Sequence, residues 1–486
     1  MICYASSKQS NISDYCVESE GRYYASAVGL NSAATNQNIS PVYIGSYITN
    51  CSNMFANASK FNQHVSIPVG VIDCSYMFYN CGYNQTTTIP NSVINCYYMF
   101  NSYVFNKPVS IGEGVLNCSY MFCNCSTYNQ STVIPNTVTD CSYMFFGSNL
   151  NQVTNVPNSA VNCMAMFSNC YNLNKKVTIS NGAVVCHAMF RYCYNFNQDV
   201  DIPDSVTGCS TMFQFCRNLN SNIKMSNNTQ YARNMFGNCI KLSKSIDIPD
   251  SVIDCNSMFY YCTNFNQPVS IPDSVTDCHN MFCGCINFNS SIRMSDNAVD
   301  LSGMFRNCNN FNQPVAIPAS CTKFDYIFGW CNNFNQSVTI PSGVTSCIQS
   351  FYNCFSFNQH IVIPQGVTSC VEMFSHCNSF CATQGTLYIP STVNSLTRMF
   401  SNTYTPGFNI YINGNVYRDV DVYCMLERTY ASQGRVNLYF NSVLNNIFNR
   451  TAASFSLTGN AIAWTAMDNG FYNSTYNIYC YYNYSG

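Results

Sequence analysis

One short word, Met-Phe or a close variant of it, recurs along most of the chain at a nearly constant interval. It begins at Met54-Phe55 and ends at Met399-Phe400, with steps of 22 or 23 residues until a last step of 26. A period this short and regular leaves room for one supersecondary unit per repeat, stacked on its neighbours. The sequence therefore predicts a repeat solenoid, which grows by adding rungs, in place of the several domains that 486 residues would otherwise suggest.

Each repeat carries the same local signals in the same order. In the copy from Cys262 to Phe282, Phe-Asn-Gln-Pro-Val-Ser-Ile-Pro is typical of a short strand ended by proline, and Asp-Ser supplies turn residues. The segment from Cys278 through Met-Phe to Cys285 spaces its apolar residues three or four apart, which favours one helical or 3-10 turn facing inward. We expect a leucine-rich-repeat type solenoid of about 16 rungs, each with one short β-strand and a short helical or 3-10 arc.

Three regions are predicted from where the repeat holds. Residues 1–50 carry only a degenerate copy and are expected to form an N-terminal cap or attachment segment, because an end rung must cover the core with an atypical face. Residues 51–405 are expected to form the solenoid. Residues 406–486 lack the repeat and are expected to form a C-terminal β-rich cap or oligomerisation module, with strands over 408–412 and 436–440.

The composition limits the partners of such a solenoid. Only 9% of residues are charged, the formal net charge is −2, and no basic run is present, so nucleic-acid binding is not expected. No apolar segment approaches about 18 residues, so no membrane insertion is expected. The first ten residues lack a basic stretch followed by an apolar one and do not predict a secretory signal. Assembly into a virus particle is one way for such a protein to leave the cell without one.

The order Met-Phe, Cys, Phe, Val-x-Ile-Pro and Ser-Val-Thr resembles the repeat of BspA-like, Treponema-type leucine-rich-repeat proteins over about residues 40–400. The chain departs from that repeat where Met-Phe replaces Ala-Phe and where the stretch from Cys to Ile-Pro is one residue longer. The Met-Phe and Phe-Asn-Gln words also resemble repeats of mycoplasma surface lipoproteins. These resemblances imply a non-enzymatic surface protein that binds extracellular matrix or other cells, and similar repeats occur in proteins of gut bacteriophages.

Most of the 32 cysteines fall in two columns of the repeat. The first column contains Cys51, Cys74, Cys96, Cys118, Cys141, Cys163, Cys186, Cys209, Cys255, Cys278, Cys347 and Cys370. The second column contains Cys81, Cys125, Cys170, Cys193, Cys216, Cys239, Cys262, Cys285, Cys308, Cys331, Cys354 and Cys377. Repeats near Tyr231, Leu301, Phe324 and Leu396 replace the first cysteine by another apolar residue, which favours a ladder of packed thiols over disulfides between rungs or metal binding.

Polar columns accompany the core. The asparagine of Phe-Asn-Gln is predicted to bond backbone between rungs, with a glycan-binding polar stripe as the alternative. Its copies are Asn62, Asn84, Asn106, Asn129, Asn151, Asn174, Asn197, Asn220, Asn266, Asn289, Asn312, Asn335 and Asn358. Tyrosines such as Tyr76, Tyr98, Tyr120 and Tyr143 lie beside the Met-Phe word and fit either a binding surface or the covering of a protein with few charges.

No residue is predicted to be catalytic, cofactor-binding or metal-ligating. The five histidines are scattered along the chain, and no hydrolase, metalloprotease or phosphate-binding motif is present. The recurring Asp254 and Asp277 fall in turns, where aspartate bonds local backbone. Enzyme activity is therefore not expected.

Two functional hypotheses follow. The first is a virion-exposed fibre or decoration protein of a phage, a homo-oligomer that binds a host cell-surface glycan or protein and attaches to other virion proteins at one end. The alternative is a cell-surface, BspA-like adhesin of a bacterium or protist. Both use the long polar face of the solenoid.

Overall fold

A computed structural model of the chain describes residues 17–19, 22–24, 42–44, 48–380, 386–405, 409–412, 430–431, 436–440, 465–467, 470–473 and 478–481. The chain forms two compact units, Met1–Lys244 and Ser245–Gly486. Much of the predicted caps, 1–50 and 406–486, lies outside the described residues, so the boundaries at 50 and 405 stay predictions.

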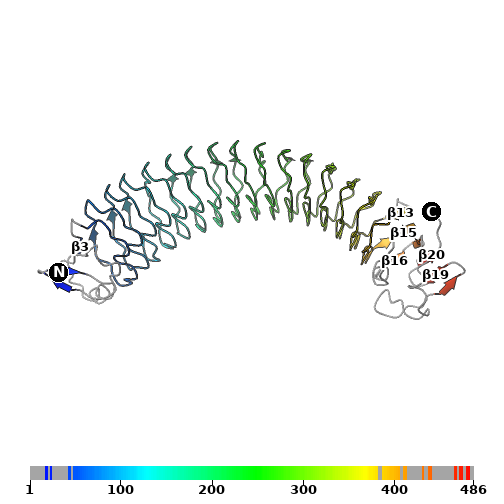
Figure 1. Cartoon of the computed structure of the whole chain (residues 1–486), viewed down its shortest axis with the longest axis horizontal. Helices are drawn as coiled ribbons and strands as arrows, with labels where there is room; N and C mark the ends of the chain where they lie inside the picture. The colour runs from blue at the N-terminus through cyan, green and yellow to red at the C-terminus, as the bar shows by residue number, and fades with distance from the viewer. Residues whose placement is uncertain are drawn as a thin grey trace. The chain divides into compact units, whose positions relative to one another are not determined.

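The predicted solenoid is confirmed. The chain winds into a β-solenoid of about 14 turns with a repeat of about 23 residues, where the sequence predicted about 16 rungs. Within each unit, successive turns follow one another along the chain (Figure 1). Equivalent residues therefore lie beside each other in neighbouring rungs, about 4.8 Å apart where strands pair.

The strands of the rungs are short because proline or a turn follows each one. In the first unit, parallel pairs join β3 (Val42–Tyr43) to β4 (Val65–Ser66), β5 (Thr87–Thr88) to β6 (Val109–Ser110), β7 (Thr154–Asn155) to β8 (Val177–Thr178), and β9 (Val200–Asp201) to β10 (Ile223–Lys224). In the second unit, β11 (Val269–Ser270) pairs in parallel with β12 (Ile292–Arg293). In β4 to β11 the first residue is buried and the second faces solvent, which is the alternation that Val-x-Ile predicts.

The predicted helical arc is wrong in detail, because the described residues of this segment form turns and no helix. In one rung, the Met54 amide donates to the Cys51 carbonyl (3.1 Å) and the Ala58 amide to the Phe55 carbonyl (3.2 Å). Asn53 and Asn57 have φ angles of 58° and 63°, which makes these two type II turns in succession. Alternate amides of the segment bond the next rung instead, as Phe55 does with the Met77 carbonyl (2.8 Å). In a helix these amides would donate to carbonyls of their own segment and could not bond the next rung.

The core is built from columns of identical side chains. The Met-Phe pairs, such as Met189 and Phe190, have no exposed surface. Phe190 stacks on Phe167 and Phe213 of the adjoining rungs at 5.6 and 5.4 Å between ring centroids. The phenylalanine of Phe-Asn-Gln joins the same column, since Phe196 lies 4.6 Å from Phe190. Parallel stacking of this kind recurs in the second unit and explains why the Met-Phe word is kept from rung to rung.

A six-stranded sheet forms near the C-terminus of the second unit. Its strand order is β13 (Thr386–Ile389), β15 (Asn409–Ile412), β17 (Val436–Phe440), β20 (Ile478–Tyr481), β19 (Gly470–Asn473) and β18 (Thr465–Met467). The first four strands are parallel and the last three antiparallel, so β20 belongs to both sets. The strands predicted over 408–412 and 436–440 are β15 and β17.

Two small sheets complete the strand inventory. One is the antiparallel pair of β1 (Val17–Ser19) and β2 (Arg22–Tyr24) in the first unit, and the other the parallel pair of β14 (Tyr404–Thr405) and β16 (Tyr430–Ala431) in the second. None of the residues that the structure describes forms a helix long and apolar enough to cross a membrane.

Candidate functional site

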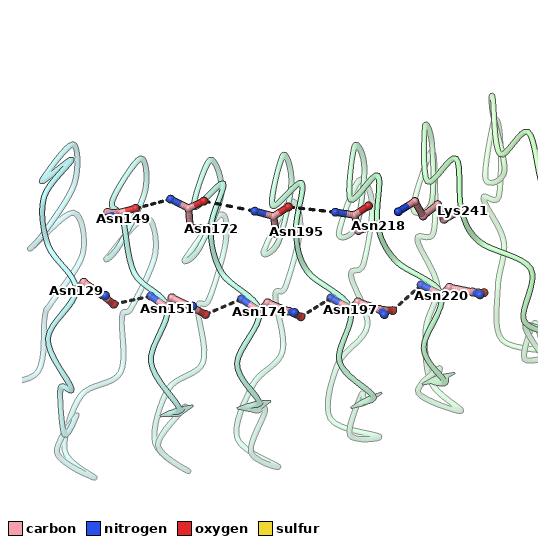
Figure 2. A pocket seen from close by; sticks show the side chains of 10 residues that line it. All are labelled: Asn129, Asn149, Asn151, Asn172, Asn174, Asn195, Asn197, Asn218, Asn220 and Lys241. Carbon is pink, nitrogen blue, oxygen red and sulfur yellow. Dashed lines mark hydrogen bonds between the residues drawn. The ribbon is translucent and has the colours of Figure 1, made fainter.

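Two parallel rows of asparagine border an open groove on the first unit (Figure 2). They arise from the word Asn-x-Asn, in which Leu150, Leu173, Phe196 and Leu219 occupy the middle position and are buried in the core. Because side chains alternate in an extended segment, both flanking asparagines then face outward. The groove has a volume of about 800 Å³. Its lining consists of Asn129, Asn149, Asn151, Asn172, Asn174, Asn195, Asn197, Asn218, Asn220 and Lys241.

The inner row is the asparagine column that the sequence singled out. The Oδ1 atom of Asn151 accepts the backbone amide of Asn174 (2.9 Å), and Asn174 Oδ1 accepts that of Asn197 (3.0 Å). The same bond joins neighbouring rungs from Asn62 to Ser243 in the first unit and from Asn266 to Asn358 in the second. The predicted structural role is confirmed, since each amide satisfies a backbone donor that would otherwise lack a protein partner.

The asparagines of the inner row have hydrogen-bond donors that no protein group uses. Each side-chain amide carries two N–H groups on Nδ2, and within residues 48–380 the structure records no acceptor for Nδ2 of Asn151, Asn174 or Asn197. The glutamine that follows most of these asparagines also points back along the ladder, as Gln152 Nε2 does to Asn129 Oδ1 (3.1 Å). The groove therefore presents one free amide donor group per rung.

The outer row was missed by the sequence reasoning. Its side chains bond one another along the stack: Nδ2 of Asn172 donates to Asn149 Oδ1 (2.6 Å), and Nδ2 of Asn218 to Asn195 Oδ1 (3.1 Å). Lys241 occupies the next position of this row. The signal that could have revealed the row is the Asn-x-Asn spacing itself, since a second asparagine precedes Leu or Phe in rung after rung.

The two cysteine columns are buried and differ in chemistry. All 27 cysteines from Cys51 to Cys377 are free, so the packed-thiol ladder is confirmed for them. In the second column the thiol donates to a carbonyl of the preceding rung, as Cys193 Sγ does to Phe167 O (3.0 Å) and Cys308 Sγ to Phe282 O (3.0 Å). Burial raises the pKa of these thiols, to about 12 at Cys170, because a thiolate would lose its hydration.

The residues that replace cysteine also differ between the two columns. The second column is filled by Ser102, Ser148 or Thr403 where cysteine is absent, and each of these brings a hydroxyl donor. Ala58, in the first clear rung, is the exception. The first column instead accepts the apolar Ala232, Leu301, Phe324 and Leu396. In the repeat near Tyr231 the replacing residue is Ala232, which is buried, whereas Tyr231 pairs with Gly208 one place earlier and is exposed.

Tyrosines beside the Met-Phe word form a column whose ring faces are covered. Tyr76, Tyr98, Tyr120 and Tyr143 stack with centroid separations of 5.2, 4.4 and 4.5 Å. Burial raises the pKa of Tyr120 to about 12. Since the rings lie face to face along the stack, they offer edges and hydroxyls to solvent. This column is therefore poorly suited to a ligand that stacks on the face of an aromatic ring.

Acidic and histidine side chains serve the backbone. Asp254 and Asp277 accept the amides two residues further on, those of Asn256 (3.1 Å) and His279 (2.9 Å), as the sequence predicts. Gly208 stands where many other rungs have Asn or Asp, and His187 of the preceding rung supplies the acceptor: its Nδ1 accepts the Ser210 amide (3.0 Å). Burial lowers the pKa of His187, which keeps the imidazole neutral for this role.

A family comparison accounts for most of the chain. The profile of the family described as "Mycoplasma protein of unknown function, DUF285" matches residues 5–89, 25–110, 68–156, 139–248, 232–340 and 323–436. The chain belongs to the DUF285 family. The predicted likeness to mycoplasma repeats is thereby confirmed, and DUF285 repeats are what form the rungs that carry the groove. No curated protein is similar to this chain in sequence.

Bacterial leucine-rich-repeat proteins are among the solved structures similar to this DUF285 protein. One is a leucine-rich repeat protein from Bacteroides ovatus, at 16% identity and a TM-score of 0.46, covering 81% of this chain and 88% of that one. Another is a leucine rich cell surface protein from Faecalibacterium prausnitzii, at 16% identity and a TM-score of 0.33, covering 79% of this chain and 88% of that one. Identities this low leave function to be argued from the groove itself.

Proposed function

We propose that this DUF285 protein is a non-enzymatic binding protein of a cell surface and that the groove of its first unit binds glycans. The observation that carries the proposal is the row of amide groups at Asn151, Asn174 and Asn197, which hold unused donors side by side in an open, polar groove. Glycans present hydroxyl and ring oxygens along their whole length. Planar amides recognise such groups through directional hydrogen bonds.

The groove is suited to recognition without catalysis. Its lining is amide throughout apart from Lys241, and amides neither titrate near neutral pH nor act as nucleophiles. The outer row adds acceptors as well as donors, since each Oδ1 uses one lone pair in the row and keeps the other. Both kinds of hydrogen-bonding group are therefore available to a sugar hydroxyl.

The phage fibre stays a prediction that no observation on the fold or the relatives supports. The cell-surface protein, its alternative, is the one proposed. Attachment at one end and a homo-oligomeric state also stay predictions.

The test is binding of the whole protein to arrays of host and bacterial glycans, repeated with two matched triple variants. Replacing Asn172, Asn195 and Asn218 by alanine removes three asparagines of the outer row of the groove, and replacing Asn287, Asn310 and Asn333 removes three of the equivalent row of the second unit. We expect binding to be lost in the first variant and kept in the second. Absence of any glycan ligand, or equal loss in both variants, would overturn the proposal.

A further inference from the structure

Three lysines lie in or directly after the asparagine rows of the groove, in a chain of which only 9% of the residues are charged. Lys241 lines the groove in the outer asparagine row. Lys175 and Lys244 occupy positions that hold glutamine in most other rungs, directly after the inner row. All three lysines are exposed, and in the part of the chain that the structure describes no carboxylate pairs with Lys175 or Lys241.

These rungs also carry aspartates, and one of them follows the inner row and bonds the backbone. Asp199 follows the inner row by two residues, and its Oδ1 accepts the backbone amide of Asn222 (2.8 Å). Arg217, which precedes the outer row, lies over the ring of Tyr194 at 4.8 Å and adds a further cation beside the groove. The groove is thus a neutral amide track with a cationic margin, a combination that attracts an anion while hydrogen-bonding a polyhydroxylated backbone.

We propose that the groove binds an extended acidic polysaccharide, with one sugar unit per rung and its carboxylates or sulfates facing Lys175, Lys241 and Lys244. This inference rests on the proposed function, which assigns the groove to glycans, and adds the charge and the repeat of the ligand. Hydrogen bonds to Nδ2 of the inner asparagines would hold the sugar units. The lysines would select the charged chains among them.

The spacing of the donors favours a polysaccharide over a peptide. Equivalent amides recur about every 4.8 Å along the stack, whereas like-facing residues of an extended peptide recur about every 6.6 Å. A peptide therefore falls out of step with the ladder within a few rungs. One pyranose unit of an extended chain is about as long as one rung is high, so a polysaccharide can repeat the same contacts from the rung of Asn129 to the rung of Asn220.

The second unit supplies the internal comparison. It repeats both amide rows, with Asn287 bonded to Asn264 (3.3 Å) and Asn312 to Asn289 (2.8 Å), but its glutamine column has no lysine or arginine. If amides alone sufficed, both units would bind the same ligands. The proposal assigns acidic ligands to the first unit.

The experiment measures the affinity of the full chain for oligogalacturonates of increasing length, for sulfated heparin fragments and for neutral cello-oligosaccharides, at low and high salt. We expect the acidic chains to bind with an affinity that rises with length until the groove is filled and falls with salt. Lys241→Gln should weaken binding about tenfold. Lys224→Gln, which removes an exposed lysine of β10 outside the groove, should leave the affinity unchanged.

Each other outcome has a definite meaning. Equal, salt-independent binding of neutral chains would overturn the acidic ligand and leave the proposed function standing. Equal binding of polyglutamate or single-stranded DNA would show attraction by charge alone and overturn the polysaccharide. Failure of every glycan to bind would remove this inference and the proposed function together.

Discussion

The amide ladders of the two units have the same hydrogen bonds and different surroundings. In the first unit, Asn197 and Asn220 donate backbone amides to the preceding asparagine at 3.0 and 2.8 Å, and in the second Asn312 and Asn335 do so at 2.8 and 2.8 Å. Lysine enters the glutamine column only in the first unit. The ladder is therefore a structural device common to both units. Binding specificity depends on the residues that vary around it.

Alkaline pH should have the largest effect and should strike both units alike. Burial raises the pKa of the thiols in the folded state, to about 12 at Cys51 and Cys321 and about 11 at Cys283, from 9.0 in the unfolded chain. The stability that the neutral thiols give is complete below pH 9 and is lost as pH rises from 9 towards these values. Each such thiol removes up to about 1.4 kcal/mol per pH unit in that window.

Urea unfolding followed by circular dichroism between neutral pH and pH 10.5 checks this expectation. With 15 described free cysteines in the first unit and 12 in the second, both should lose stability steeply above pH 9. Thiol labelling of the folded protein at neutral pH should be slow and should become fast in urea. A first unit that stays folded to a higher pH than the second would contradict the expectation that thiols are buried alike in the two cores.

Removing an inner asparagine should cost similar stability in each unit. Asn174→Ala leaves the backbone amide of Asn197 without its acceptor, and Asn312→Ala does the same to Asn335. We expect each to lower the free energy of unfolding by about 1–2 kcal/mol, because the backbone amide loses its acceptor and the following glutamine loses its bond to the same oxygen. Chemical denaturation measures both. A cost in one unit only would mean that the ladders differ in structure and not merely in surroundings.

Removing an outer asparagine should cost less and should separate the units by binding. Asn195→Ala and Asn310→Ala each break bonds between exposed side chains, so we expect a loss of about 0.5 kcal/mol in each. Affinity for an acidic oligosaccharide should fall in the first variant only. Titration calorimetry on both proteins tests this, and an equal fall would place the ligand elsewhere.

The smallest effect is expected for Lys175→Gln, which restores the glutamine that most other rungs have at this position. The new amide can donate to Asn151 Oδ1, as Gln198 Nε2 does to Asn174 Oδ1 (3.0 Å). Stability should therefore rise by a few tenths of a kcal/mol, while acidic oligosaccharides bind more weakly. Gln336→Lys in the second unit removes such a bond and should show the opposite change in stability. A Lys175→Gln protein that bound acidic chains as well as before would remove this lysine from the site.

The core and the inner ladder could be predicted from the sequence because each comes from a short motif that recurs at a fixed position of the repeat. Met-Phe and Phe-Asn recur at one period, and stacking brings like residues together whatever the details of the rung. The hydrogen-bonding role of the second cysteine column was not predicted. Its signal is the replacement of cysteine by Ser102, Ser148 and Thr403, which is visible only when substitutes are sorted by their ability to donate.

The sequence by itself determined the repeat, the buried columns and the asparagine ladder, because each follows from a side chain that recurs in register. The tertiary structure alone decided that the predicted arc is a pair of turns. Residues with positive φ there include Tyr76, Ala165, Thr211, Glu372 and Arg398, none of which favours that conformation by itself. Bonds to the next rung hold them there, as the Tyr76 amide does by donating to the Tyr97 carbonyl (2.8 Å). Contacts between rungs fix a backbone that no single rung would choose, and the same contacts line up the amides of the groove.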